Sequence, residues 1–541
     1  MVAIRHRALQ LLALGLLVAG GAFAQDLSCS LAGTLQNVRA EGKAELLGDI
    51  NIECVAADDD LVAAPWPSKQ VNIIVNLPVN VTNNIDFGQG DDTTDARLIV
   101  NDVPQLYGVR TANKEIAFDD VNVPFPGFNG NPDTTVIRIS SIRGNVTQLG
   151  LPSEGNVITI DAIVSTEPPS TLGVPVGSVT VGFSRLSLIS EGVDNKIDGL
   201  QCVEFDSDDD GEDDPVLTLR EGFASAWKTQ GTPSDAKNTF WESGYFATGS
   251  NNGAGASQET QFLLNISGVP ANVNLSVPQT IFGTGELILS LIGGDTDGDI
   301  ALCGGAVGDA AVDVDSDGNA EIIYGVCDND PNFREEVEVP FTVDWALDDD
   351  DEVPEPGSAT VTASYYPLGG SDFSNDDDPE PRFVDTASEP EEFLNLAKCV
   401  TTLLFPFVTN QSGFDTGLAI SNTSEDWGLS GIDGQTGGCE IHYIGTDTSD
   451  ETPEDDVTTE DVEAGGQVVW LLSAGGSHGL VGAPDFQGYV LAACDFQYAH
   501  GYAFITDGFG GGIPALAQGY LALVIPANRG VTDGGTESLG N

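Results

Sequence analysis

Glu336-Val-Glu-Val-Pro-Phe-Thr-Val-Asp-Trp345 is the stretch that decides the fold class. Its apolar residues occupy every second position: Val337, Val339, Phe341, Val343 and Trp345. Glu336, Glu338, Thr342 and Asp344 lie between them. Because successive side chains of a strand point to opposite faces of a sheet, this period of two predicts one apolar face and one acidic face. The stretch therefore predicts a half-buried β-strand.

The same alternation recurs along the chain, between clusters of Gly, Asn, Asp and Pro that favour turns. Further strands are predicted at Val71–Val81, Thr135–Ile142, Val157–Val164, Ser178–Leu188, Gln261–Ser267, Glu286–Ile292, Ala359–Tyr365, Leu403–Val408, Gln467–Leu472 and Gly488–Ala493. Only Pro390–Lys398 has the pattern of a short amphipathic helix. Many short strands separated by turns predict an all-β protein of tandem antiparallel β-sandwich domains, of the immunoglobulin-like kind.

The length of the chain, 541 residues, is too great for one hydrophobic core. Composition predicts β-sandwich blocks at about 25–195, 196–370 and 393–530, an acidic, Pro-containing linker at 371–392, and a polar tail at 531–541. Charge repulsion is expected to keep the linker extended. The middle block is either one domain or two. Asp348–Gly357 is either a connector or a long hairpin loop.

The first 24 residues have the pattern of a secretory signal peptide. Arg5 and Arg7 precede an apolar run at Leu9–Val18, and Ala22-Phe23-Ala24 fits a cleavage site. No later segment reaches the roughly 20 apolar residues that a membrane-spanning helix needs. The sequence therefore predicts a protein that is secreted or held at the cell surface, without a transmembrane segment in the mature chain.

All 8 cysteines follow the predicted cleavage site, and none is spaced as CxxC. In an exported protein an even number of cysteines indicates disulfides rather than zinc or redox chemistry. Proximity in the sequence favours Cys29–Cys54, Cys303–Cys327 and Cys439–Cys494, which leaves Cys202 and Cys399.

The formal net charge of −65 excludes nucleic acids and anionic membranes as natural partners. Such a chain attracts cations. Most of the carboxylates are expected to form a solvated surface, and some to be organised into metal sites.

Two acidic loops fit the frame D-x-D-x-D-G-x-x-[DE]. Carboxylates at alternate positions of a tight turn can face one centre, and Ca²⁺ takes six to eight oxygen ligands. Three sets of candidate ligands follow: Asp206, Asp208, Asp210 and Asp214; Asp313, Asp315, Asp317 and Glu321; and, in a shorter version, Asp295, Asp297 and Asp299. No helix–loop–helix surrounds them. The loops alone resemble the calcium loops of β-proteins such as integrin propeller blades and thrombospondin repeats. We predict structural calcium here; the alternative is Asp-rich turns in an Asp-rich protein.

Catalytic signals are few. Gly475–Gly479 fits G-x-S-x-G, with Asp485, Asp495 and His500 after it in the order of the α/β-hydrolases. No helix is expected after Ser477, and about two dozen residues hold the whole set, where that fold needs a far longer scaffold. The histidines show no HExxH or HxH spacing. We therefore expect a non-catalytic protein without catalytic residues or an organic cofactor.

Six tryptophans suggest a carbohydrate-binding alternative. Trp345 and Trp470 lie in strand patterns and are expected in cores, whereas Trp66 and Trp427 are the better candidates for exposure.

Several stretches resemble an uncharacterised family of large secreted β-rich proteins of environmental bacteria. They are Val38–Gly42, Gly48–Ile50 with Cys54, Leu403–Asn410, Phe414–Gly417, Gly488-Tyr489 and Phe496–Gly501. The resemblance covers much of the first and last blocks. It implies a shared exported architecture, and it implies no activity and no site residues.

Taken together, these patterns predict an extracellular structural or adhesive protein, such as a matrix, surface-layer or filament component. Its expected partner is a second copy of itself or a surface glycan. A carbohydrate-binding protein is the first alternative and a secreted hydrolase the second.

Overall fold

The computed structural model describes the chain in segments between residues 27 and 525. The described ranges are 27–56, 68–83, 92–168, 172–173, 178–201, 204–206, 214–230, 255–256, 259–297, 308–346, 354–366, 383–424, 434–447, 453–458, 460–507 and 516–525. The predicted signal peptide (1–24) and polar tail (531–541) lie outside them. The described residues form β-strands and a few short 3₁₀ turns, which confirms the all-β prediction.

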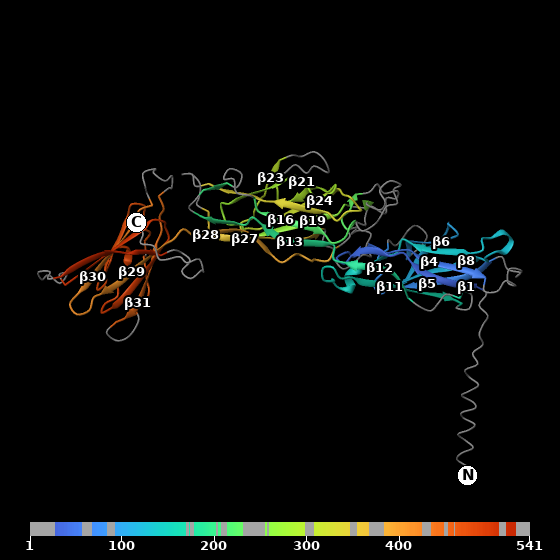
Figure 1. Ribbon diagram of the computed structural model, residues 1–541, viewed down its shortest axis with the longest axis horizontal. Helices are drawn as coiled ribbons and strands as arrows, with labels where there is room; N and C mark the ends of the chain where they lie inside the picture. The colour runs from blue at the N-terminus through green and yellow to red at the C-terminus, as the bar shows by residue number, and fades with distance from the viewer. Residues whose placement is uncertain are drawn as a thin grey trace, which may run out of the picture.

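Three hydrophobic cores divide these strands into an N-terminal unit (27–185), a middle unit (188–397) and a C-terminal unit (401–525). Figure 1 shows the three units following one another along the longest axis. The boundaries differ from those read in the sequence, because Leu188 and Phe393 both belong to the middle core.

The N-terminal unit is one ten-stranded sheet in the order β1-β4-β9-β6-β7-β8-β5-β11-β12-β2, with the small pair β10-β3 beside it. Its strands are β1 (Leu27–Gly33), β2 (Gln36–Arg39), β3 (Glu45–Leu46), β4 (Ile50–Ala56), β5 (Ser68–Asn76), β6 (Thr93–Val100), β7 (Val103–Ala112), β8 (Glu115–Pro124), β9 (Thr135–Ser140), β10 (Arg143–Gly144), β11 (Ile158–Glu167) and β12 (Ser178–Arg185), with the 3₁₀ turns η2 (Phe128–Gly130) and η3 (Val146–Leu149). Strands β1 and β2 lie at opposite ends of this strand order, yet only two residues separate them in the chain. The two edges of the sheet must therefore be close in space, so the sheet curves round its core.

The middle unit surrounds its core with sheets of seven, four and three strands: β14-β28-β27-β19-β24-β22-β21, β15-β26-β20-β23 and β13-β16-β25. Strands β17 and β18 form a separate two-stranded sheet, and β17 lies beside β24. The strands are β13 (Leu188–Asp194), β14 (Ile197–Leu200), β15 (Phe205–Asp206), β16 (Val216–Glu221), β17 (Thr229–Gln230), β18 (Gly255–Ala256), β19 (Gln261–Ser267), β20 (Asn274–Pro278), β21 (Thr280–Phe282), β22 (Ile288–Gly294), β23 (Asp309–Ala311), β24 (Ala320–Asp328), β25 (Glu336–Pro340), β26 (Thr342–Trp345), β27 (Gly357–Tyr366) and β28 (Glu391–Ala397).

The C-terminal unit is a two-layer sandwich. Its five-stranded sheets, β32-β31-β35-β29-β38 and β34-β33-β30-β36-β37, share one core. The strands are β29 (Thr401–Thr409), β30 (Asp415–Asn422), β31 (Cys439–Thr446), β32 (Asp456–Val457), β33 (Gln467–Leu471), β34 (Gly475–Gly476), β35 (Gln487–Cys494), β36 (Ala499–Thr506), β37 (Ala517–Leu521) and β38 (Leu523–Ile525), with the 3₁₀ turn η5 (Ser477–Gly479).

The stretch that predicted the fold class behaves as expected at its apolar positions. Val337, Val339, Val343 and Trp345 are buried in the middle core, as is Phe341 between them. The stretch is nevertheless two strands, because β25 pairs with β16 whereas β26 pairs with β20 and β15. One alternating run therefore contributes to two sheets of the same core.

Pro390–Lys398 is not a helix, and this prediction was wrong. Its residues form β28, which pairs with β27 on one side and with β14 on the other. The register shifts between Ala359 and Thr360, so Phe393 and Leu394 are buried side by side. This break in the alternation is what gave the segment a helix-like apolar pattern.

Two predicted disulfides are present: Cys29–Cys54 and Cys439–Cys494. Each joins directly paired residues, of β1 and β4 in one case and of β31 and β35 in the other. Cys327 and Cys399 are also disulfide-bonded. Cys202 and Cys303 lie outside the described residues, so the Cys303–Cys327 pairing stays a prediction.

A buried polar joint connects the N-terminal and middle units. The Glu41 carboxylate accepts hydrogen bonds from the Ser187 backbone N–H at 2.9 Å and from its hydroxyl at 2.7 Å. The Ser187 Oγ lies 2.9 Å from the Tyr365 hydroxyl, to which Trp227 Nε1 donates at 3.1 Å. All four residues are buried. This chain of hydrogen bonds runs from the edge of one core into the centre of the next.

An ion pair forms the other half of the joint. Arg39 Nε donates to Glu45 Oε1 at 2.9 Å, and both residues are buried. The Arg39 guanidinium also lies 4.9 Å from the centre of the Phe383 ring. Burial raises the pKa of Glu45, but Arg39 and Lys228 outweigh it, so the net pKa is lowered. Glu45 therefore stays ionised and paired at neutral pH.

Phe383 corrects the predicted linker at 371–392. Its ring is buried and stacks on Tyr365, with centroids 4.5 Å apart. The next residue, Val384, donates its backbone N–H to the Glu41 carbonyl at 3.0 Å. The charge pattern suggested an extended spacer, yet Phe383 and Val384 pack on the joint, because Phe383 supplies an apolar anchor. The earlier part of the predicted linker lies outside the described residues.

Glu221 makes the stability of the middle unit dependent on pH. Its buried carboxylate accepts from the backbone N–H groups of Trp227 at 2.8 Å and Glu335 at 3.2 Å. Burial nevertheless raises the pKa of Glu221 to about 8, from the usual 4.5 of a glutamate. Between these values the folded protein binds more protons than the unfolded chain, so its stability falls as pH rises.

We therefore expect Glu221→Gln to flatten the fall in unfolding free energy between pH 5 and 8, by up to about 1.4 kcal/mol per pH unit. Urea unfolding at a series of pH values measures this. Glu338→Gln, at an exposed carboxylate of the neighbouring strand β25, is the matched control and should leave the slope unchanged. An unchanged slope in Glu221→Gln would contradict the prediction.

Candidate cation-binding groove

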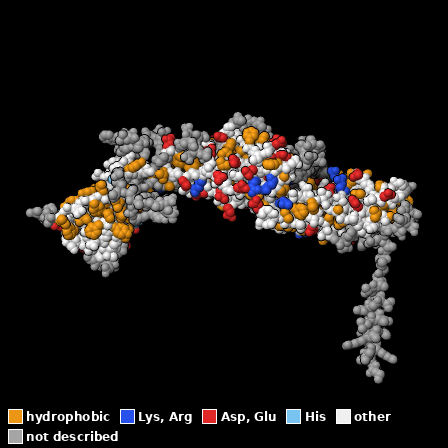
Figure 2. All heavy atoms as spheres, viewed as in Figure 1, with side chains coloured by type: hydrophobic (Ala, Val, Ile, Leu, Met, Phe, Trp, Pro, Cys, Tyr) orange, Lys and Arg blue, Asp and Glu red, His pale blue; other side chains and the backbone are white. Residues whose placement is uncertain are grey.

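An acidic groove of about 760 Å³ crosses one end of the middle unit. Its lining comes from the loop between β19 and β20 with the start of β20, from the loop between β23 and β24, and from the segment before β27. Its carboxylates are Asp313, Asp315, Asp317, Asp344 and Glu355. Figure 2 shows acidic side chains gathered over the middle unit in that view.

Residues 313–318 of the predicted loop Asp313–Glu321 line this groove, and the loop has the tight turn that its glycine predicted. The Asp315 carboxylate accepts from the backbone N–H groups of Asn319 at 2.8 Å and Asp317 at 2.9 Å. These donors lower the pKa of Asp315. Gly318 has a φ of +80°, and a Cβ there would meet the Val269 carbonyl oxygen at 2.7 Å. Only glycine fits this position.

The structure also brings together two loops that the sequence presented separately. Asp295 Oδ2 accepts from the Glu321 N–H at 2.9 Å, and the Asp295 carbonyl accepts from the Asp313 N–H at 2.8 Å. Asp297 donates its N–H to the Ala311 carbonyl at 3.1 Å. Asp295 and Asp297 thus lie beside the Asp313–Glu321 loop, and Asp299 lies outside the described residues.

The predicted set of Asp206, Asp208, Asp210 and Asp214 is only partly described. Asp206 ends β15 and is paired in register with Asp344, which lines the groove. Asp214 lies before β16, where its carbonyl accepts from Asn195 Nδ2 at 3.3 Å. Asp208 and Asp210 lie outside the described residues. Asp206 therefore stands one strand away from the groove.

Sequence reasoning missed two groove residues. Asp344 was read as part of the solvent face of its strand, and Glu355 as part of an acidic connector. The Asp344 carboxylate accepts from Asn274 Nδ2 at 2.8 Å, which turns it toward β20. The alternation could predict that Asp344 faces outward, but only the pairing of β26 with β20 places it beside the loop.

The donor set consists of oxygen atoms, as Ca²⁺ requires. Within the described residues, no three of these carboxylates bring oxygen atoms within 4.8 Å of one another. Asp313, Asp317 and Glu321 are exposed, so packing does not hold their side chains in one orientation.

The G-x-S-x-G stretch does not form a nucleophile site. Ser477 Oγ accepts from the Val469 N–H at 2.8 Å and donates to the Val469 carbonyl at 3.3 Å. The residues after Ser477 form the short turn η5 rather than a helix. The hydroxyl ties η5 to strand β33, which is a structural role.

Trp345 and Trp470 are buried, as predicted, and so is Trp227. Trp66 and Trp427 lie outside the described residues. The structure adds a shallow apolar groove of about 320 Å³ on the β33-β30-β36 face of the C-terminal unit, with Trp470, Tyr502 and Phe504 among its lining residues. Figure 2 shows hydrophobic side chains over this unit.

No family model and no curated protein matches the chain. Among solved structures, a biofilm-associated protein BSP domain is similar at 8% identity and a TM-score of 0.18, covering 91% of this chain and 95% of that one. The full-length major pilin SpaD of Corynebacterium diphtheriae is similar at 10% identity and a TM-score of 0.20, with 91% and 88% covered. The T6 backbone pilin of Streptococcus pyogenes serotype M6 is similar at 8% identity and a TM-score of 0.22, covering 91% of this chain and 80% of that one. Similarities at this level carry no argument about function.

No helix of a length and hydropathy that would span a membrane occurs in the part of the chain that the structure describes.

Proposed function

We propose that the protein is an exported, non-catalytic structural or adhesive component of the cell surface or extracellular matrix, stabilised by disulfides and calcium. The observation that carries this proposal is the buried joint of Arg39, Glu41, Glu45, Ser187 and Tyr365. A joint of buried, mutually bonded polar groups has one favourable arrangement, because any slippage leaves them unpaired without water. The two units therefore behave as one stiff body, which suits a protein that spans distance.

The Val38–Gly42 stretch supplies several of the contacts of the joint. Arg39 and Glu41 supply its ion pair and its hydrogen-bond acceptor, and Gly42 bridges to Phe383. The use of this stretch in buried packing supports an architectural role.

Assembly tests the proposal. The purified mature chain is studied by light scattering and electron microscopy, with millimolar calcium and then with chelator. Filaments, sheets or other ordered assemblies are expected in calcium. A chain that stays monomeric under both conditions would overturn the self-assembly part of the proposal.

Calcium in the acidic groove supports this role by neutralising repulsion between carboxylates. At the millimolar affinity typical of extracellular modules, 10 mM calcium should stabilise the middle unit by about 1–2 kcal/mol and raise its Tm by roughly 2–6 °C. Asp313→Asn/Asp317→Asn should abolish the rise. Asp119→Asn/Asp120→Asn on β8 removes the same charge far from the groove and should keep it. Differential scanning calorimetry measures all three, and an equal rise in both variants would refute a site in the groove.

Carbohydrate binding is the second candidate, and the apolar groove of the C-terminal unit is the observation that favours it. Tyr502 on its rim is exposed and presents an aromatic ring to solvent. Flat aromatic surfaces of this kind suit the apolar faces of sugar rings. A glycan array with Tyr502→Ala as the comparison separates this function from assembly.

A further inference from the structure

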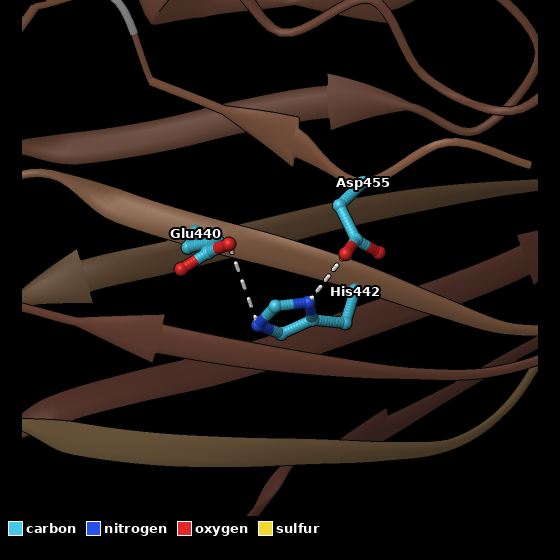
Figure 3. A group of neighbouring side chains, drawn as sticks. All are labelled: Glu440, His442 and Asp455. Carbon is cyan, nitrogen blue, oxygen red and sulfur yellow. Dashed lines mark ion pairs between the residues drawn. The ribbon is translucent and has the colours of Figure 1, made fainter.

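His442 lies between two carboxylates on the outward face of the C-terminal unit (Figure 3). Its Nδ1 is 2.9 Å from Asp455 Oδ2, and its Nε2 is 3.9 Å from Glu440 Oε1. His442 is half-buried, and both carboxylates are exposed. Within the described residues, this is the only group of three or more His, Cys, Asp or Glu side chains whose ligand atoms lie within 4.8 Å of one another.

The strand register produces this arrangement. Glu440 and His442 are two residues apart on β31, so their side chains share a face of the sheet. Strand β32 pairs Val457 with Glu440 and Asp456 with Ile441, which places Asp455 across from His442. The Asp456 carboxylate points inward and accepts from the N–H groups of Val481 at 2.7 Å and Gly482 at 2.9 Å. Asp456 thereby fixes the short edge strand and holds Asp455 in place.

The two distances at the imidazole have different meanings. At 2.9 Å, Nδ1 and Asp455 Oδ2 form a close ion pair, and Nε2, on the other side of the ring, faces Glu440. At 3.9 Å, Nε2 and the Glu440 oxygen are too far apart for a hydrogen bond. Two ligand atoms of one tetrahedral zinc ion are about 3.4 Å apart, so a shift of roughly 0.5 Å in the exposed Glu440 carboxylate brings both atoms to bonding distance of one cation.

We propose that Glu440 and His442 bind a divalent transition-metal ion of the Zn²⁺ class, with Asp455 orienting the imidazole. A metal-bound histidine usually donates its other ring N–H to a carboxylate, which is the role that Asp455 has here. Imidazole suits zinc and copper, whereas Ca²⁺ prefers oxygen ligands alone. The remaining coordination positions face solvent and are open to water or to a ligand from another molecule.

The neighbouring strand β35 places no further metal-ligating side chain beside His442 and Glu440. On the same face, β35 places Leu491 opposite His442 and Ala493 opposite Glu440. This apolar border limits the hydration of the site on one side and strengthens the attraction of the carboxylates for a cation. The site lies in a different unit from the acidic groove and does not depend on the proposed function.

Isothermal titration of the tag-free mature chain with Zn²⁺, in 10 mM calcium to occupy the oxygen-only sites, tests the proposal. One Zn²⁺ per chain is expected to bind. His442→Gln and Glu440→Gln should each weaken this binding more than about tenfold, and Asp455→Asn about tenfold. His500→Gln is the matched control, since His500 is an exposed histidine of strand β36 in the same unit, and it should bind as the parent does.

A second measurement identifies the ligand atom. In ¹⁵N-histidine-labelled protein, Zn²⁺ should shift the Nε2 resonance of His442 and leave those of His478 and His500 in place. The proposal is overturned if zinc shifts no His442 resonance, or if His442→Gln binds zinc as tightly as the parent while its near-ultraviolet circular dichroism stays native. Neither result would bear on calcium-dependent assembly.

Discussion

Arg39→Ala should lower the free energy of unfolding of the joined N-terminal and middle units by about 3–5 kcal/mol. Arg39 and its partner Glu45 are buried, and two guanidinium nitrogens contact Glu45 Oε1 at 2.9 and 2.8 Å. Without the guanidinium, the Glu45 carboxylate loses its principal counter-charge in a site that water does not reach. The Phe383 ring loses the cation that lies over it. Urea unfolding followed by tryptophan fluorescence measures the loss.

Two comparison variants separate this effect from a general loss of charge. Arg138→Ala removes an arginine whose 3.5 Å pair with Asp49 is exposed, with side-chain exposures of 43% and 31%, and should cost at most about 1 kcal/mol. Arg39→Met/Glu45→Leu removes both partners and should recover most of the stability lost in Arg39→Ala. If Arg39→Ala and Arg138→Ala cost the same, the joint does not hold the two units together.

The fold class followed from the sequence because one periodicity is enough to identify a half-buried strand. The alternation of Glu336–Trp345 could not predict that the chain passes from one sheet to another at Phe341. The period of two is the same before and after this residue. Phe393 and Leu394 show the converse. A β-bulge turned two successive side chains inward, and the sequence then had the spacing of a helix.

The candidate sites were predicted where their residues are neighbours in the sequence and missed where strand pairing brings them together. The Asp313–Glu321 turn was visible in its spacing, whereas the approach of Asp295 and Asp344 depends on register. Likewise, HExxH and HxH spacings do not include His442, whose partner Asp455 directly precedes the next strand, β32. The available signal was the spacing Glu440-x-His442, since residues two apart share a face wherever the chain forms a strand.

Phe341→Ala should destabilise the middle unit by about 3–5 kcal/mol. The ring is buried and stacks on Phe393, with centroids 5.1 Å apart and planes 20° apart. Phe393 belongs to β28, so this contact ties the point where β25 becomes β26 to the last strand of the unit. Truncation leaves a cavity where two sheets meet, and sheets that are hydrogen-bonded internally cannot both move to fill it.

Two variants on the same stretch test that explanation by urea unfolding. Phe341→Leu keeps most of the volume and should lose less than half as much stability as Phe341→Ala, because a smaller cavity remains. Glu338→Ala truncates an exposed side chain of β25 and should change the unfolding free energy by no more than about 0.5 kcal/mol. A loss below about 1 kcal/mol in Phe341→Ala would mean that the two sheets do not depend on this contact. A loss of the expected size would show that the side chain at the change of sheet, as well as the alternation around it, holds the core of the middle unit together.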